Sequence, residues 1–187
     1  MRFLIVLFVL VSAPVLASPA TDADAAAVAL AGTSGDWRGE LQYRDYQSDR
    51  WQGLPMTVTV AAQPDGVTTV RTAQYDDGPQ TGMVTITTVT LIDPAASTAS
   101  YAIFRKKRAA DTGLSRITAF TRGADSEHWT LVTIEARKDG DQMAQVRETT
   151  TRAGPEMIIQ KDVNPDNDGR DEWLPRNRSL LTVSSGQ

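Results

Sequence analysis

Apolar and polar residues alternate with a period of two along most of this chain. In residues 37–44, Trp37, Gly39, Leu41 and Tyr43 fall on one side, and charged or amide residues fall on the other. Side chains of a β-strand point alternately to its two faces, so this pattern predicts a strand. The same reasoning predicts further strands at residues 56–62, 67–75, 83–92, 98–106, 114–122, 127–138, 142–151, 156–163 and about 176–183.

Short turn sequences separate these predicted strands. Residues 64–66 read Pro-Asp-Gly and residues 139–141 read Asp-Gly-Asp, which are residue types that tight turns prefer. No connection is long enough for a crossover helix, so neighbouring strands should be antiparallel. We therefore expect an all-β fold, an antiparallel up-and-down barrel of about eight to ten strands.

The chain before the first strand has a different pattern. Residues 22–31 are rich in Ala and predict a short helix that Gly32 ends. Further upstream, Arg2, the apolar run 3–11 and small residues up to Ala17 are typical of a secretory signal peptide. The expected organisation is a signal peptide at 1–17, an N-terminal segment with the short helix at 18–34, and a barrel domain at 35–187. Cleavage after Ala20 is the alternative.

The composition limits the compartments and the classes of partner that the protein is expected to have. The signal pattern predicts an exported protein, periplasmic or extracellular. The chain has no Cys, which excludes disulfides and a lipid-anchored cysteine, so we expect no membrane insertion after cleavage. Without Arg2, 18 basic and 23 acidic side chains give a net charge of −5, which disfavours nucleic acid as a partner. The basic run 105–108 is expected to be a solvated strand end and loop.

The stretch Gly35-Asp36-Trp37 on the first predicted strand resembles the Gly-x-Trp signature of the lipocalins and the wider calycin superfamily. The resemblance implies a bacterial secreted protein with a lipocalin-like barrel, in which the Trp closes one end. It also implies an Arg near the end of the last strand that packs on the indole. Arg178 is our choice for that partner, with Arg176 as the alternative. The chain lacks the usual lipocalin disulfide, and ten strands suit the fatty-acid-binding or nitrobindin-like members better.

No arrangement of residues predicts catalysis. The chain has no Cys and no Gly-x-Ser-x-Gly motif, and its one histidine, His128, has a plain interpretation as a polar residue at a strand start. We therefore lean away from an enzyme and expect no catalytic residue and no cofactor. Asn164, Asp166 and Asp168 alternate before a Gly, as in calcium loops, but the same residues suit any exposed acidic turn, which is the interpretation we favour.

Several arginines are candidates for the inside of the barrel. If the relevant strand faces point inward, Arg71, Arg116 and Arg147 enter a cavity, where an acidic ligand or Glu135 and Glu148 would neutralise them. Tyr101 and Phe120 are candidate ligand contacts, and Met83, Phe104 and Trp129 are further candidate wall residues. The favoured function is non-enzymatic binding of a small, partly apolar molecule. If the arginines point inward, that molecule would also carry an acidic group. The alternative is an envelope structural or interaction protein with a packed barrel and no ligand.

Overall fold

A computed structural model describes residues 22–166 and 169–184. The expected signal peptide, the end of the tail and Asp168 lie outside the described residues. The described elements are α1 (Asp22–Ala31), β1 (Gly35–Asp45), β2 (Arg50–Ala62), β3 (Thr68–Asp76), α2 (Gly78–Thr81), β4 (Met83–Asp93), β5 (Thr98–Arg105), β6 (Asp111–Arg122), β7 (His128–Asp139), β8 (Gln142–Ala153), β9 (Glu156–Pro165) and β10 (Leu174–Val183).

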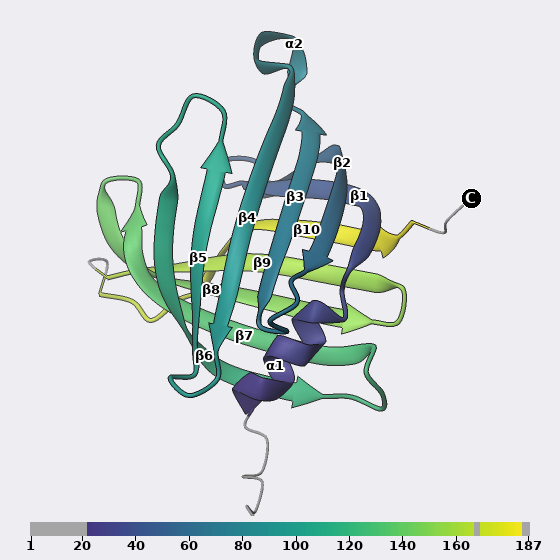
Figure 1. Cartoon of the computed structure of the whole chain (residues 1–187). Helices are drawn as coiled ribbons and strands as arrows, with labels where there is room; N and C mark the ends of the chain where they lie inside the picture. The colour runs from purple at the N-terminus through teal and green to yellow at the C-terminus, as the bar shows by residue number, and fades with distance from the viewer. Residues whose placement is uncertain (1–21, 167–168, 185–187) are drawn as a thin grey trace, which may run out of the picture.

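The strands form one closed antiparallel barrel in which each strand pairs with its neighbours in the chain (Figure 1). β1 closes the barrel by pairing with β10, with Trp37 opposite Val183 and Tyr43 opposite Asn177. Both the expected fold class and the helix at residues 22–31 are confirmed. The short helix α2, in the β3–β4 connection, was not expected, and β2 begins at Arg50, several residues before the predicted start.

The helix α1 covers the lower end of the barrel in Figure 1. Its alanines are small enough to let the helix approach the strands closely. Ala26 packs with Trp129 and Leu131, and Ala27 packs with Ile92 and Ala99. The opposite end carries the α2 connection and the longer hairpins. The barrel therefore has a floor made by α1 and an uncovered upper end.

The largest cluster of buried apolar side chains among the described residues lies where β1 to β4 meet β9 and β10. There the inward side chains of these strands form one cluster, made of Trp37, Met56, Val58, Val60, Ala73, Tyr75, Val84, Met157 and Leu181. Gly39 belongs to the inward row as well, and a Cβ on it would lie 1.8 Å from the carbonyl oxygen of Leu180, so only glycine fits there. Several members of this cluster, among them Met56, Val60 and Tyr75, also line the open space inside the barrel. None of the described helices has the length and apolar character that a membrane-spanning helix requires.

Candidate functional site

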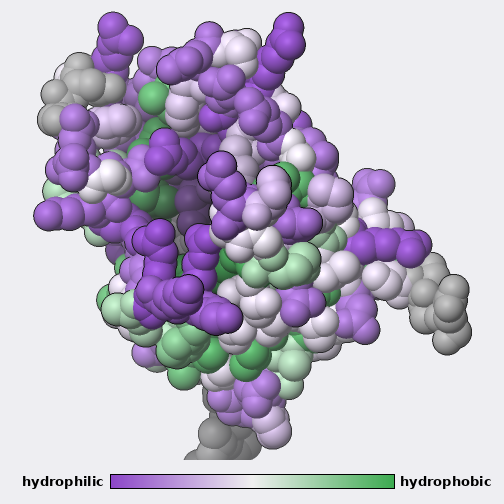
Figure 2. Space-filling view, turned by 90° about the horizontal axis from the view of Figure 1, so that it is seen from above, coloured by the Kyte–Doolittle hydropathy of each residue, from purple (hydrophilic) through white to green (hydrophobic). Residues whose placement is uncertain are grey.

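A cavity of about 330 Å³ occupies the barrel interior between the floor and the upper end. Every one of the ten strands contributes side chains to its wall, and Leu30 and Thr33 contribute from the helix end. Figure 2 looks down on the upper end and shows a hollow that is surrounded mostly by hydrophilic residues. The volume lies at the lower end of the range for small-molecule sites, about 300–1,000 Å³.

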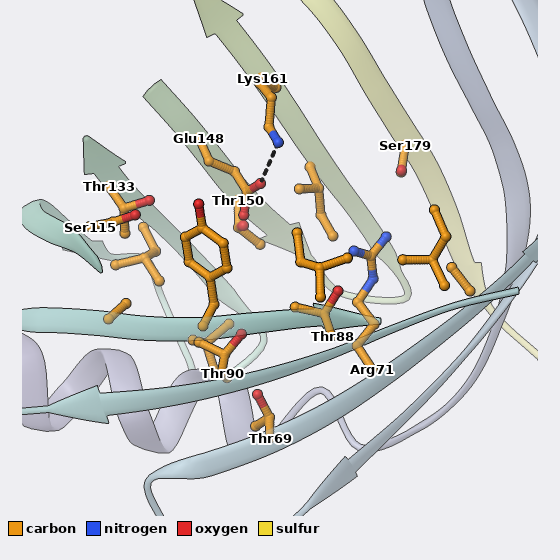
Figure 3. Close-up of a pocket in the computed structure, with 18 of the residues that line it drawn as sticks. Thr69, Arg71, Thr88, Thr90, Ser115, Thr133, Glu148, Thr150, Lys161 and Ser179 are labelled. Atoms are coloured by element: carbon orange, nitrogen blue, oxygen red, sulfur yellow. Dashed lines mark ion pairs between the residues drawn. The ribbon is translucent and has the colours of Figure 1, made fainter. Parts of the chain in front are cut away.

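Arg71 is the one expected arginine that the structure places inside the cavity. It lies on β3 opposite Val60 of β2 and Thr88 of β4, and its side chain extends into the barrel (Figure 3). The Arg71 Nε atom is buried and has no hydrogen-bond partner among the described residues. Burial lowers the pKa of the guanidinium below its ordinary value, and the Glu148 carboxylate partly counters that effect. The cavity thus contains a guanidinium with one buried, unpaired donor, its Nε.

Glu148 and Lys161 lie on the wall that Arg71 faces. They are opposite each other on β8 and β9, and the Lys161 Nζ atom lies 4.0 Å from a Glu148 carboxylate oxygen. The carboxylate is therefore shared between a lysine at ion-pair distance and an arginine farther away (Figure 3). With one carboxylate and two cations, this part of the cavity carries a net positive charge.

A second polar group lies around Tyr101. Its hydroxyl donates to the Glu135 carboxylate, with oxygen–oxygen distances of 2.8 and 2.9 Å, and accepts a hydrogen bond of 2.6 Å from Arg137. Arg137 also contacts Glu135 at 3.2 Å and Asp111 at 2.7 Å. Burial and then the Glu135 hydrogen bond raise the pKa of the Tyr101 phenol well above its ordinary value. Glu135 therefore neutralises Arg137 rather than Arg71, and these charges are already paired.

Gly113 helps to place Tyr101. It is the cross-strand neighbour of Tyr101 on β6, and a Cβ there would lie 2.3 Å from the phenol oxygen. The ring therefore covers the glycine, as aromatic residues do in many sheets. The pairing directs the hydroxyl toward Glu135.

The structure places Arg116 and Phe120 outside the cavity lining, which corrects the expectation that they share an inward face. Arg116 is exposed because Ser115 points inward on this strand and Leu114, 58% exposed, points outward. A register shift between Ile117 and Ala119 then reverses the alternation. Phe120 consequently turns toward the floor, where its ring centroid lies 6.2 Å from that of Trp129.

Arg147 also points away from the cavity, contrary to the expectation. Val146 and Glu148 take the inward positions on β8, so Arg147 lies on the outer surface. There it contacts Asp162 at 2.9 Å and lies 4.3 Å from the ring centroid of Trp173. Asp162 is only 3% exposed beneath these side chains. The pair fastens the segment before β10 to the barrel wall and has no part in the cavity.

The expected partner of Trp37 is wrong. Trp37 is buried at 2% exposure near the floor, but Arg178 lies on the outer face and stacks on Trp51, 4.2 Å from its ring centroid. Arg176 pairs instead with Asp139 at 3.4 Å. The arginine over the Trp37 indole is Arg152 of β8, at 5.5 Å. The sequence motif pointed to the last strand and could not reveal this partner. Arg152 lies on β8, which comes near Trp37 of β1 only when the barrel is closed.

The remaining candidates are spread over the surface and the floor. Met83 and Phe104 are 68% and 49% exposed, and Trp129 is buried in the floor. His128 contacts Asp125 at 2.7 Å in an exposed turn. Asn164 donates to Asp171 at 2.8 Å, and the described residues contain no group of three or more His, Cys, Asp or Glu that could hold a metal.

The fold and the cavity together define a class, an up-and-down β-barrel with an internal, partly polar cavity. That architecture is compatible with a lipocalin-like fold. Comparison with protein-family models and with curated proteins finds no match to this chain.

Proposed function

We propose that this protein is an exported binding protein, which holds a small anionic and partly apolar molecule in its barrel without converting it chemically. The observation that carries the proposal is Arg71, whose guanidinium points into the cavity with a buried and unpaired Nε. Leaving a buried donor unpaired costs about 1–3 kcal/mol, and more for a charged group. A ligand anion would remove this cost.

The cavity walls support the apolar part of the proposal. Leu41, Met56 and Ile86 face the same space as Arg71, from three different strands. A ligand with an acidic group at Arg71 would therefore contact aliphatic side chains beside that group. The volume of about 330 Å³ favours this proposal over the packed-barrel alternative, because a structural barrel needs no such space.

The proposal extends to the family and the compartment. It places the chain among calycin-like barrels of secreted bacterial proteins, with residues 1–17 as the signal that directs it to the periplasm or the medium. Trp37 after Gly35 supports the family, although its arginine partner comes from β8 rather than β10. Mass spectrometry of the exported protein should find an N-terminus at Ser18, or at Thr21 for the alternative cleavage. An N-terminus at Met1 on all of the cell-associated protein would contradict export.

Native mass spectrometry of protein purified from its host tests the binding role. We expect a co-purified anion in the wild type and in Arg116→Met, and its loss in Arg71→Met. Arg116→Met is the matched control, because it removes the same charge from an exposed position outside the barrel.

Titration with cyclohexanecarboxylate and its neutral amide completes the test. The acid should bind to the wild type and to Arg116→Met, and the amide and Arg71→Met should each weaken binding by about tenfold or more. Equal binding of acid and amide would contradict a role for Arg71. If no anion co-purifies and neither probe binds, the packed-barrel alternative replaces this proposal.

A further inference from the structure

Serine and threonine side chains line much of the cavity in addition to the charged groups and tyrosines. Thr33 donates its hydroxyl to the carbonyl oxygen of Leu30 and is satisfied. The others make no side-chain hydrogen bond to another described residue, and Figure 3 shows them around the same space as Arg71. They are Thr69, Thr88, Thr90, Ser115, Thr133, Thr150 and Ser179.

These hydroxyls lie beside the charged groups in the strand register. Thr88 is the cross-strand neighbour of Arg71, and Thr133 is the cross-strand neighbour of Glu148. Thr69 and Thr90 are opposite each other one step nearer the floor. A ligand whose anion reaches Arg71 would therefore have hydroxyl groups along its sides as well as aliphatic ones.

An alkyl chain would match the aliphatic part of this lining but would leave its hydroxyls without partners. It would displace water from the hydroxyls and return no hydrogen bond, and unpaired buried polar groups are unfavourable. A ring that bears its own hydroxyls would replace the water contacts, while its C–H faces would lie against Ile86 and Leu131. The outward threonines differ, since Thr72 and Thr87 on β3 and β4 lie with their hydroxyl oxygens 3.4 Å apart, within hydrogen-bond distance.

We infer that the ligand of this cavity is a hydroxylated organic acid of the size of one sugar ring, such as a uronic acid, with its carboxylate at Arg71 and its hydroxyls on the Thr and Ser wall. This inference rests on the proposed function, because it assumes that an anion binds at Arg71. The cavity volume of about 330 Å³ lies at the lower end of the range for small-molecule sites, which suits a ligand of one ring.

Three probes separate the two proposals in a calorimetric titration of the whole protein. Glucuronate has the carboxylate and the hydroxyls, cyclohexanecarboxylate has only the carboxylate, and glucose has only the hydroxyls. We expect glucuronate to bind at least about tenfold more tightly than either of the others. Equal or tighter binding of cyclohexanecarboxylate would overturn the hydroxyl inference and leave the anion site standing. Glucose binding as tightly as glucuronate would overturn anion recognition, and failure of both carboxylates to bind would overturn both proposals.

Isosteric Thr→Val variants test which hydroxyls contribute to glucuronate binding. Thr90→Val with Thr133→Val should weaken glucuronate binding by about tenfold and leave cyclohexanecarboxylate binding unchanged. The control, Thr72→Val with Thr87→Val, removes two hydroxyls from the outer face of β3 and β4 and should change neither affinity. Equal losses of glucuronate affinity in both double variants would contradict the proposed wall.

Discussion

Arg152 of β8 lies over the indole of Trp37 of β1, with its guanidinium carbon 5.5 Å from the ring centroid, although the two strands are not neighbours. The same guanidinium donates to the carbonyl oxygens of Gly32 and Gly154, at 2.6 and 3.2 Å, and to the Glu127 carboxylate at 2.7 Å. It thereby joins the end of α1 to two turns at the floor. One side chain, only 8% exposed, holds together parts of the chain that are distant in sequence.

Arg152→Met should destabilise the protein substantially. The variant leaves the two carbonyl groups without a donor and removes the contact with the Trp37 ring, so we expect a loss of about 2–4 kcal/mol in the free energy of unfolding. Arg178→Met is the matched control, because Arg178 stacks on Trp51 at the outer surface and should cost less than about 1 kcal/mol. Urea denaturation measures both. Equal losses would mean that Arg152 has no special role in closing the floor.

Trp37→Ala should cost about 3–5 kcal/mol, as truncation of a large buried aromatic does. Trp37 is 2% exposed, and its Nε1 donates to the Thr33 carbonyl oxygen at 2.8 Å, so it also fastens the loop after α1. Trp37→Phe keeps a ring but loses this donor, and should fall between the wild type and the alanine variant. Thermal or urea unfolding would contradict the closure role if Trp37→Ala lost less than about 1 kcal/mol.

Alternation along the strands predicts the barrel, because each strand shows the pattern within its own residues. It does not predict which face of a strand points inward when both faces carry polar residues. On β6 the inward row begins with Gly113 and Ser115, and the apolar Leu114 is exposed. The rule that the more apolar face of a strand points inward therefore gave the wrong orientation for this strand. The bulge after Ile117 then exchanges the inward and outward rows of β6, and no residue type in that stretch predicts a bulge.

The candidate site was predicted in part for the same reason. Arg71 and Tyr101 follow from alternation in strands that have no bulge, and the structure places both in the cavity wall. Glu135 and Glu148, the carboxylates expected to neutralise inward arginines, line the cavity as well. Arg137 shares a row with Glu135 and Leu131 and could have been assigned to the interior by the same reasoning. The pairing of Arg137 with Glu135 and Asp111 involves β6 as well as β7, so it depends on the folded register.

Tyr43 should titrate late in the folded protein. Partial burial of Tyr43, which is 42% exposed, raises the pKa of its phenol from 10.0 to about 12, and the neighbouring Tyr75 adds to the shift. Because the folded value is above the unfolded one, the stabilisation is complete below about pH 10 and is lost as the pH rises toward 12. Ultraviolet titration should therefore show fewer late phenols in Tyr43→Phe than in the wild type. A normal titration of every tyrosine in the folded wild type would contradict the shift.

The Arg147–Asp162 pair on the outer wall gives the last prediction, through a double-mutant cycle. Asp162 is 3% exposed and has Arg147 at 2.9 Å and the Gln160 amide at 2.8 Å, so loss of the arginine leaves a buried carboxylate with a single neutral donor. Arg147→Met should therefore cost about 2–4 kcal/mol, somewhat below the cost for a fully buried pair because Arg147 itself is 31% exposed. Adding Asp162→Asn to that variant removes the unpaired charge and should recover at least half of the loss. Urea denaturation of the four proteins gives the coupling, and additive losses in the double variant would show that the two side chains do not stabilise each other.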